Sequence, residues 1–126
     1  MTNQMRGIRG AARVAVNTRE AILTETRSLL EKMVAANAVE TGDIASIFFT
    51  TTPDLNSEFP AYAARDMGWR LVPVLCAREI DVPQGMSGVV RILMHVNTSR
   101  GQEEIRHIYE GETATLRPDL SEGDAP

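Results

Sequence analysis

The 126-residue sequence is poor in the residues that build disulfides, metal sites and membrane anchors. Cysteine occurs once, as Cys76, so neither an intrachain disulfide nor a cysteine-rich metal site can form. The first ten residues, MTNQMRGIRG, lack the apolar segment of a signal peptide, and no uncharged run approaches the length of a membrane span. We therefore expect a cytoplasmic protein with no membrane partner.

Positive charge is also scarce, because 13 Lys and Arg residues against 17 Asp and Glu residues give a net charge of −4. A general nucleic-acid binder would be basic, so we expect no nucleic-acid partner, and any anion site must be local. The sequence has no phosphate-binding glycine loop and no serine–histidine–aspartate order. Its two histidines, His95 and His107, are too far apart to form a metal-binding pair on one element. These absences predict neither a metal nor a cofactor.

The most informative stretch is GVVRILMHVNT, over residues 88–98. With the two-residue period of a strand, one face is wholly apolar, whereas the other places Arg91 between Val89 and Leu93. An unpaired guanidinium among aliphatic side chains would cost several kcal/mol. Arg91 therefore needs an anion, which is either a protein carboxylate in a plain ion pair or a ligand carboxylate in a water-poor pocket.

The rest of the chain predicts one α+β domain over residues 1–120 and a mobile acidic tail over residues 121–126. An apolar helical face from Ile22 to Val34 predicts a long helix capped by Asn17 or Thr18. We expect a mixed five-stranded sheet packed on this helix and on a short helix over residues 60–67. The expected strands cover residues 5–16, 44–51, 69–80 and 88–98, followed by a terminal hairpin over residues 107–116 with its turn at Glu110-Gly111.

Proline inside the third expected strand limits where that strand can lie. Pro73 has no N–H to donate to a ladder, so the strand lies at a sheet edge, meets another subunit or contains a bulge. In the short helix before it, we expect Phe59, Ala63 and Met67 on one side, and Tyr62 and Arg65 facing a cleft.

Arginines cluster at or near the expected strand ends, as Arg9, Arg91 and Arg117, with Arg65 on the short helix. The guanidinium fork matches a carboxylate in a bidentate manner, so several forks indicate a small polyanionic ligand. Glu79 and Tyr109 add an acceptor and a hydroxyl. Each has a simpler interpretation, because Glu79 could pair with an arginine and Tyr109 could be an edge-strand aromatic.

The motifs RGIRGA, TPDL with FPA and a following arginine, GW, VPV with a following cysteine, IRHIY and LRPDL occur in that order. Together they resemble the AroH class of monofunctional chorismate mutases over about residues 6–120. The resemblance implies a pseudo-α/β-barrel homotrimer with active sites between subunits. It also implies the conversion of chorismate to prephenate in aromatic amino acid biosynthesis, without a cofactor.

The resemblance further implies a role for each candidate residue. Arg91 would lie beside the ether oxygen and a carboxylate of chorismate, Arg9 and Tyr109 would hold the side-chain carboxylate, and Glu79 and the backbone of Cys76 would contact the ring hydroxyl. The apolar wall and the mouth would be formed by Phe59, Ala61, Val74, Leu75 and Leu116, and by Arg65 and Arg117.

Two departures and two alternatives accompany this interpretation. Tyr62 stands where familiar members of the class carry a lysine, and the connection before Gly68-Trp69 is one residue shorter. One alternative is a Rid-type imine deaminase, whose order of motifs is not seen. The other is a non-catalytic module that binds a carboxylate metabolite.

Overall fold

The computed structural model describes residues 3–117, so the tail predicted over residues 121–126 lies outside the described residues. A five-stranded sheet has the strand order β3-β2-β4-β1-β5. Pairs β1–β4 and β2–β4 are antiparallel and pairs β1–β5 and β2–β3 are parallel, which confirms the mixed sheet. The strands are β1 (Gln4–Arg13), β2 (Ile44–Thr51), β3 (Val74–Arg78), β4 (Val89–Thr98) and β5 (Ile108–Tyr109).

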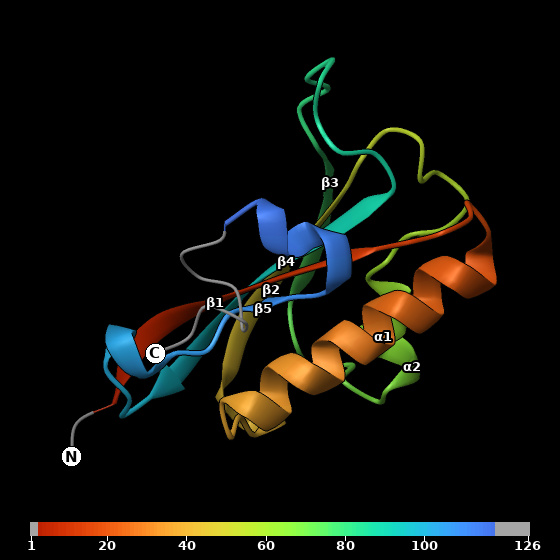
Figure 1. Ribbon diagram of the computed structural model, residues 1–126. Coiled ribbons are helices and arrows are strands. Elements are labelled where there is room, and N and C mark those ends of the chain that lie inside the picture. Colours follow the sequence, from red (N-terminus) through yellow and green to blue (C-terminus); the bar gives the residue numbers. More distant parts are fainter. Residues whose placement is uncertain (1–2, 118–126) are drawn as a thin grey trace.

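Two α-helices lie together on one side of this sheet (Figure 1). They are α1 (Arg19–Ala36) and α2 (Tyr62–Asp66), and the 3-10 helices are η1 (Thr41–Asp43), η2 (Gln102–Glu104) and η3 (Gly111–Thr115). Thr18 caps α1 by accepting a hydrogen bond from the N–H of Ala21. A Cβ added to Gly10 would lie 2.5 Å from the Met33 sulfur, so this glycine allows α1 to approach β1 closely.

The two faces of β4 differ as the alternation predicts, but the second face is only partly covered, since Val89 is 1% exposed whereas Arg91 is exposed. Val90, Met94 and Val96 lie in the core beneath α1. Arg91 and Leu93 point to the other side, and Leu93 is 37% exposed. Within a single chain the Arg91 side chain is thus partly open to solvent, and a water-poor pocket around it stays a prediction for an assembly of copies. We call this side the open face, and its exposed apolar side chains include Phe48, Leu75 and Leu93.

The third strand is shorter than expected, because β3 begins only at Val74. Residues 69–72 form a turn in which the N–H of Val72 donates to the Trp69 carbonyl. Pro73 precedes the strand and accepts a hydrogen bond from the N–H of Ile47 through its carbonyl. The edge position, one of the three alternatives that Pro73 leaves open, is found, since β3 pairs only with β2 in the sheet of the described residues. Pro73 itself lies before the strand, so the expectation of a proline inside it is wrong.

The predicted hairpin strand at residues 112–116 is wrong, because η3 occupies this segment on the side of the sheet away from α1 (Figure 1). Gly111 begins η3 with a φ of 54°, and Thr113 is fully buried. The Thr113 hydroxyl lies 3.1 Å from the Ala11 carbonyl of β1. This contact fastens η3 to β1 through a side chain rather than through a strand ladder.

A buried asparagine ties the end of α1 to the chain that leads into β5. The Asn37 side-chain N–H groups donate to the carbonyls of Met33 and Arg106, at 2.9 and 2.8 Å. Its carbonyl oxygen accepts from the N–H of Arg106 at 2.8 Å. All of its polar atoms are therefore satisfied, and the register of β5 beside β1 is fixed from the helix side.

The segment between β3 and β4 projects beyond the rest of the molecule (Figure 1). Ile80 and Val82 in this segment are 88% and 58% exposed.

No helix within residues 3–117 is long and apolar enough to cross a membrane.

Candidate active site

The open face presents two opposite charges side by side. Arg91 Nε lies 3.2 Å from Glu79 Oε2, and Thr50 donates its hydroxyl to the same carboxylate oxygen. Thr50 lies directly opposite Arg91 in the β2–β4 register, and Glu79 directly follows β3. The Glu79 side chain is only 17% exposed, whereas that of Arg91 is 44% exposed. The carboxylate is thus held in place, and the guanidinium can still reach a ligand.

Phe59 and Cys76 line a hollow of about 500 Å³ between β3 and the loop of residues 53–60. Phe59 is 60% exposed, which corrects the expectation that it packs with Ala63 and Met67. Burial raises the pKa of the Cys76 thiol, although a backbone hydrogen bond from Ala61 opposes this effect. The thiol is therefore neutral near pH 7, which favours a packing role over a nucleophilic one.

The loop that carries Phe59 is held by the start of α1. The Asn17 side-chain carbonyl accepts from the N–H groups of Asn56 and Ser57, both at 3.1 Å, and its amide donates to Asn56 Oδ1 at 2.8 Å. Arg19 forms an ion pair of 2.8 Å with Glu58. Asn17 thus serves this loop rather than capping the helix, a role that the sequence alone did not reveal.

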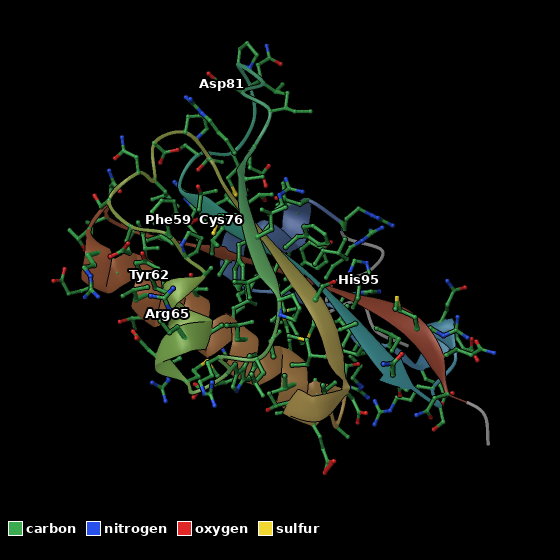
Figure 2. The ribbon with its side chains drawn as sticks, turned by 180° about the vertical axis from the view of Figure 1, so that it is seen from behind. Phe59, Tyr62, Arg65, Cys76, Asp81 and His95 are labelled. Carbon is green, nitrogen blue, oxygen red and sulfur yellow. The ribbon has the colours of Figure 1, made fainter. Side chains whose placement is uncertain are left out.

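A second hollow, of about 440 Å³, lies where α2 meets β3. It is lined by the predicted site residues Phe59, Ala61, Arg65, Val74, Leu75 and Cys76, by Tyr62, which was expected to face a cleft with Arg65, and by the unpredicted Trp69 and Arg70. Figure 2 shows Phe59, Tyr62 and Arg65 following one another along the same side of the molecule, with Cys76 near Phe59. Four of the five residues expected in the apolar wall thus lie near Arg65 in the chain, and the fifth, Leu116, does not line this hollow.

Arg9 and Arg117 line a third hollow, of about 290 Å³, together with Arg6 and His107. The Nδ1 atom of His107 accepts a hydrogen bond of 3.0 Å from the N–H of Arg9. Burial lowers the pKa of His107, and the positive charges of Arg9 and Arg117 lower it further. His107 is therefore a neutral acceptor that positions the backbone of Arg9, a role that sequence reasoning missed.

Acidification is expected to weaken the fold through His107. Because its folded pKa lies below the ordinary 6.5, the unfolded chain binds the proton more readily, and the free energy of unfolding should fall as the pH drops below 6.5. His107→Asn keeps an acceptor at this position but cannot be protonated. Urea unfolding at about pH 7.5 and about pH 5.5 should show a smaller loss for this variant. An equal loss in both proteins would contradict the assigned role.

Tyr109 is buried to 8% exposure and lines a fourth hollow with Lys32 and Glu110, which form an ion pair. Leu116 is half-buried just after η3.

No group of three His, Cys, Asp or Glu side chains within residues 3–117 is arranged to hold a metal ion.

The predicted site residues therefore form two groups at opposite edges of the sheet. The β3-edge group consists of Phe59, Ala61, Arg65, Val74, Leu75, Cys76 and Glu79, to which the ion pair joins Arg91. The β5-edge group consists of Arg9, Tyr109, Leu116 and Arg117. Neighbouring strands lie about 4.8 Å apart, so β3 and β1 are separated by roughly 14 Å. Arg91 is nearer to the second group, because β4 pairs with β1 and places Arg91 opposite Ala11. Within residues 3–117 the residues on and around β3 therefore lie far from Arg9 and Tyr109, whereas Arg91 lies between the two groups on β4.

These features define a small α+β protein whose mixed sheet presents Arg9, Arg91 and the Glu79 carboxylate. The family model for chorismate mutase type I matches residues 5–120. The chain belongs to the type I chorismate mutase family.

Individual relatives agree with this assignment. The chain is 44% identical to chorismate mutase AroH of Bacillus subtilis (strain 168) over 118 residues, which cover 93% of either protein. It is 48% identical to chorismate mutase AroH of Thermus thermophilus over 117 residues, which cover 92% of this chain and 96% of that protein. The solved structure of a chorismate mutase from Clostridium thermocellum superimposes with a TM-score of 0.87 at 44% identity, covering 88% of this chain and 99% of that one.

Proposed function

We propose that the protein rearranges chorismate to prephenate at sites formed between copies of the chain in a homotrimer. Its family makes it a chorismate mutase, an isomerase that acts on a small molecule. The observation that carries the proposal for this chain is the Arg91–Glu79 pair on the open face. The pair offers a cation and an anion to one ligand, which is what a reaction with charge separation needs.

The rearrangement is unimolecular and pericyclic, so it requires no nucleophile and no proton transfer. The protein can accelerate it by holding a compact conformer and by stabilising charge as the C–O bond lengthens. An acceleration of about 10⁶-fold requires about 8 kcal/mol, of which a single well-placed donor supplies roughly 3 to 4 kcal/mol. Conformer selection by the apolar wall must supply much of the remainder.

We assign the roles as follows. Arg91 donates to the ether oxygen, on which negative charge grows, and Glu79 faces the ring fragment that becomes relatively positive. Arg9 and Tyr109 hold the side-chain carboxylate. The backbone of Cys76 contacts the ring hydroxyl, while Arg65 and Arg117 stand at the mouth.

Three observations support the homotrimer. The residues on and around β3 lie far from Tyr109 and Arg117 near β5, so a copy that places its β5 edge beside the β3 edge of its neighbour would complete a site. Exposed apolar side chains on the open face would be buried by neighbouring copies. The projecting segment of residues 79–88 gives each copy a second surface for a neighbour. Such a head-to-tail contact closes into a ring of three copies if each copy is rotated by about 120° relative to the one before it.

Incubation of the purified protein with chorismate tests the activity. We expect chorismate to disappear and prephenate to appear without added metal or nucleotide, as followed by absorbance and chromatography. Binding without conversion would favour a carboxylate sensor, and release of ammonia from an imine substrate would favour a Rid-type deaminase. A reaction without protein is the control for uncatalysed rearrangement, and Arg91→Ala should convert chorismate more slowly than the wild type.

The pathway and the cellular location follow from the same proposal. A chorismate mutase works in aromatic amino acid biosynthesis, and we expect this one in the cytoplasm.

A further inference from the structure

Arg65 contacts an aromatic ring, whereas the ion-paired arginines of the chain contact carboxylates. Within residues 3–117 it has no carboxylate within ion-pair distance. Its guanidinium carbon instead lies 4.5 Å from the centre of the Tyr62 ring. The charge is exposed and is not neutralised by the chain, at the rim of a hollow whose other lining is largely apolar. It is therefore available to an anionic ligand.

The local sequence explains why the ring and the guanidinium meet. Tyr62 and Arg65 are three residues apart in α2, so both project from the same side of the helix. Ala63 and Ala64 are buried to 1% exposure and hold the helix against the core. The Phe59 ring packs edge-on against Tyr62, with 5.7 Å between the ring centres. Tyr62 thus has a fixed neighbour on one side and Arg65 on the other (Figure 2).

We propose that Tyr62 is a positioning residue that holds the Arg65 guanidinium over the hollow between α2 and β3, ready for a carboxylate of the substrate. This inference rests on the proposed function. An arginine side chain loses considerable rotamer freedom when it binds a ligand, and stacking on a ring reduces the freedom that remains to be lost. The effect acts on binding rather than on the bond-breaking step, because Arg65 lies at the rim.

Steady-state kinetics of Tyr62→Leu, which keeps an apolar side chain but removes the ring, provide the first test. We expect KM to rise about 2- to 5-fold with little change in kcat, the size expected from an exposed cation–π contact. Tyr62→Phe keeps the ring face and should restore most of the KM. Equal effects of the two variants would show that the hydroxyl matters rather than the ring, and would overturn the proposal.

A double-variant comparison separates positioning from general packing. In an Arg65→Ala background, Tyr62→Leu should have no further effect on KM, because its effect passes through Arg65. Arg70 lines the same hollow and lacks a ring contact, so the effects of Arg70→Ala and Tyr62→Leu should add. Additive effects of Tyr62→Leu with Arg65→Ala would overturn the proposal.

A measurement without substrate keeps the proposal distinct from the assigned activity. The Tyr62 ring should shift the proton resonances of the Arg65 δ-methylene upfield, and Tyr62→Leu should abolish this shift whereas Tyr62→Phe retains it. If the wild type fails to convert chorismate but shows the shift, the proposed function fails while the stack stands. If the shift is absent from the wild type, the positioning role is refuted whatever the activity.

Discussion

Arg91→Ala is expected to lower kcat by about 10²- to 10³-fold, the loss seen when one donor to a developing oxyanion is removed. The guanidinium is the only one within residues 3–117 that is ion-paired to Glu79, so no neighbour replaces it at that carboxylate. Stopped-flow or continuous absorbance assays at saturating chorismate measure the effect. Circular dichroism and thermal unfolding should show a retained fold, because the Arg91 side chain is 44% exposed and the pair contributes little to stability.

Two other substitutions make this prediction specific. Arg91→Lys keeps the charge but loses the planar fork, so it should recover only part of kcat. Arg65→Ala should act mainly on KM, since Arg65 lies at the rim of its hollow. Small and equal losses for Arg91→Ala and Arg65→Ala would contradict the assigned roles.

Mixing two inactive variants is expected to restore activity. Arg91→Ala damages the β3-edge group and Arg9→Ala damages the β5-edge group. If each site takes one group from each of two neighbouring copies, an equal mixture that is unfolded and reassembled together should have about one quarter of its sites intact. The measurement is the specific activity of the reassembled mixture against that of each variant treated alone.

The control mixture combines Arg91→Ala with Glu79→Ala. These side chains are 3.2 Å apart in one chain and belong to the same group. Every site would therefore receive a group that lacks one of them, and no activity should return. Recovery in neither mixture, together with light scattering that shows a single copy, would refute shared sites. Recovery in both mixtures would also contradict the assignment of Arg91 and Glu79 to one group.

Local patterns predict the central elements of the fold well. The strand predicted over residues 44–51 has the bounds of β2 itself, because its alternation is bounded by the polar segment before it and by the Thr52-Pro53 pair after it. The long helix is confirmed, since its apolar face matches the buried Ile22, Leu29 and Met33. In both elements the buried face and the residues that bound the element are close in sequence. The local sequence pattern is therefore sufficient to predict the element.

Local patterns do not determine whether a sheet face is covered, or which contacts form between segments distant in sequence. Alternation in β4 correctly assigns Arg91 to the face opposite the core, but alternation cannot tell whether that face is covered. In the last segment, Glu110-Gly111 is typical of a hairpin turn. The structure has η3 instead, because the Thr113 hydroxyl reaches the Ala11 carbonyl of a strand about a hundred residues earlier. No local pattern reports such a contact.

The candidate site is predicted in composition more fully than in geometry. The resemblance supplies the residues, and the sequence allows an ion pair between Glu79 and an arginine, which the structure shows to be Arg91. The contact between Tyr62 and Arg65 could have been found from their spacing of three residues on a helix. The hydrogen bond from Arg9 to His107 could not, because it depends on how the chain before β5 lies beside β1.

The strand order β3-β2-β4-β1-β5 also bears on how the chain folds as it is synthesised. The first strand to leave the ribosome, β1, pairs with β4 and β5, which are the last strands to emerge. Until residue 98 has left the ribosome, β1 can pack only against α1. The backbone N–H and C=O groups of β1 then have no partner strand. Nascent chains halted before β4 should therefore expose unpaired backbone and depend on chaperones, and the sheet should close in a late, cooperative step governed by contacts distant in sequence.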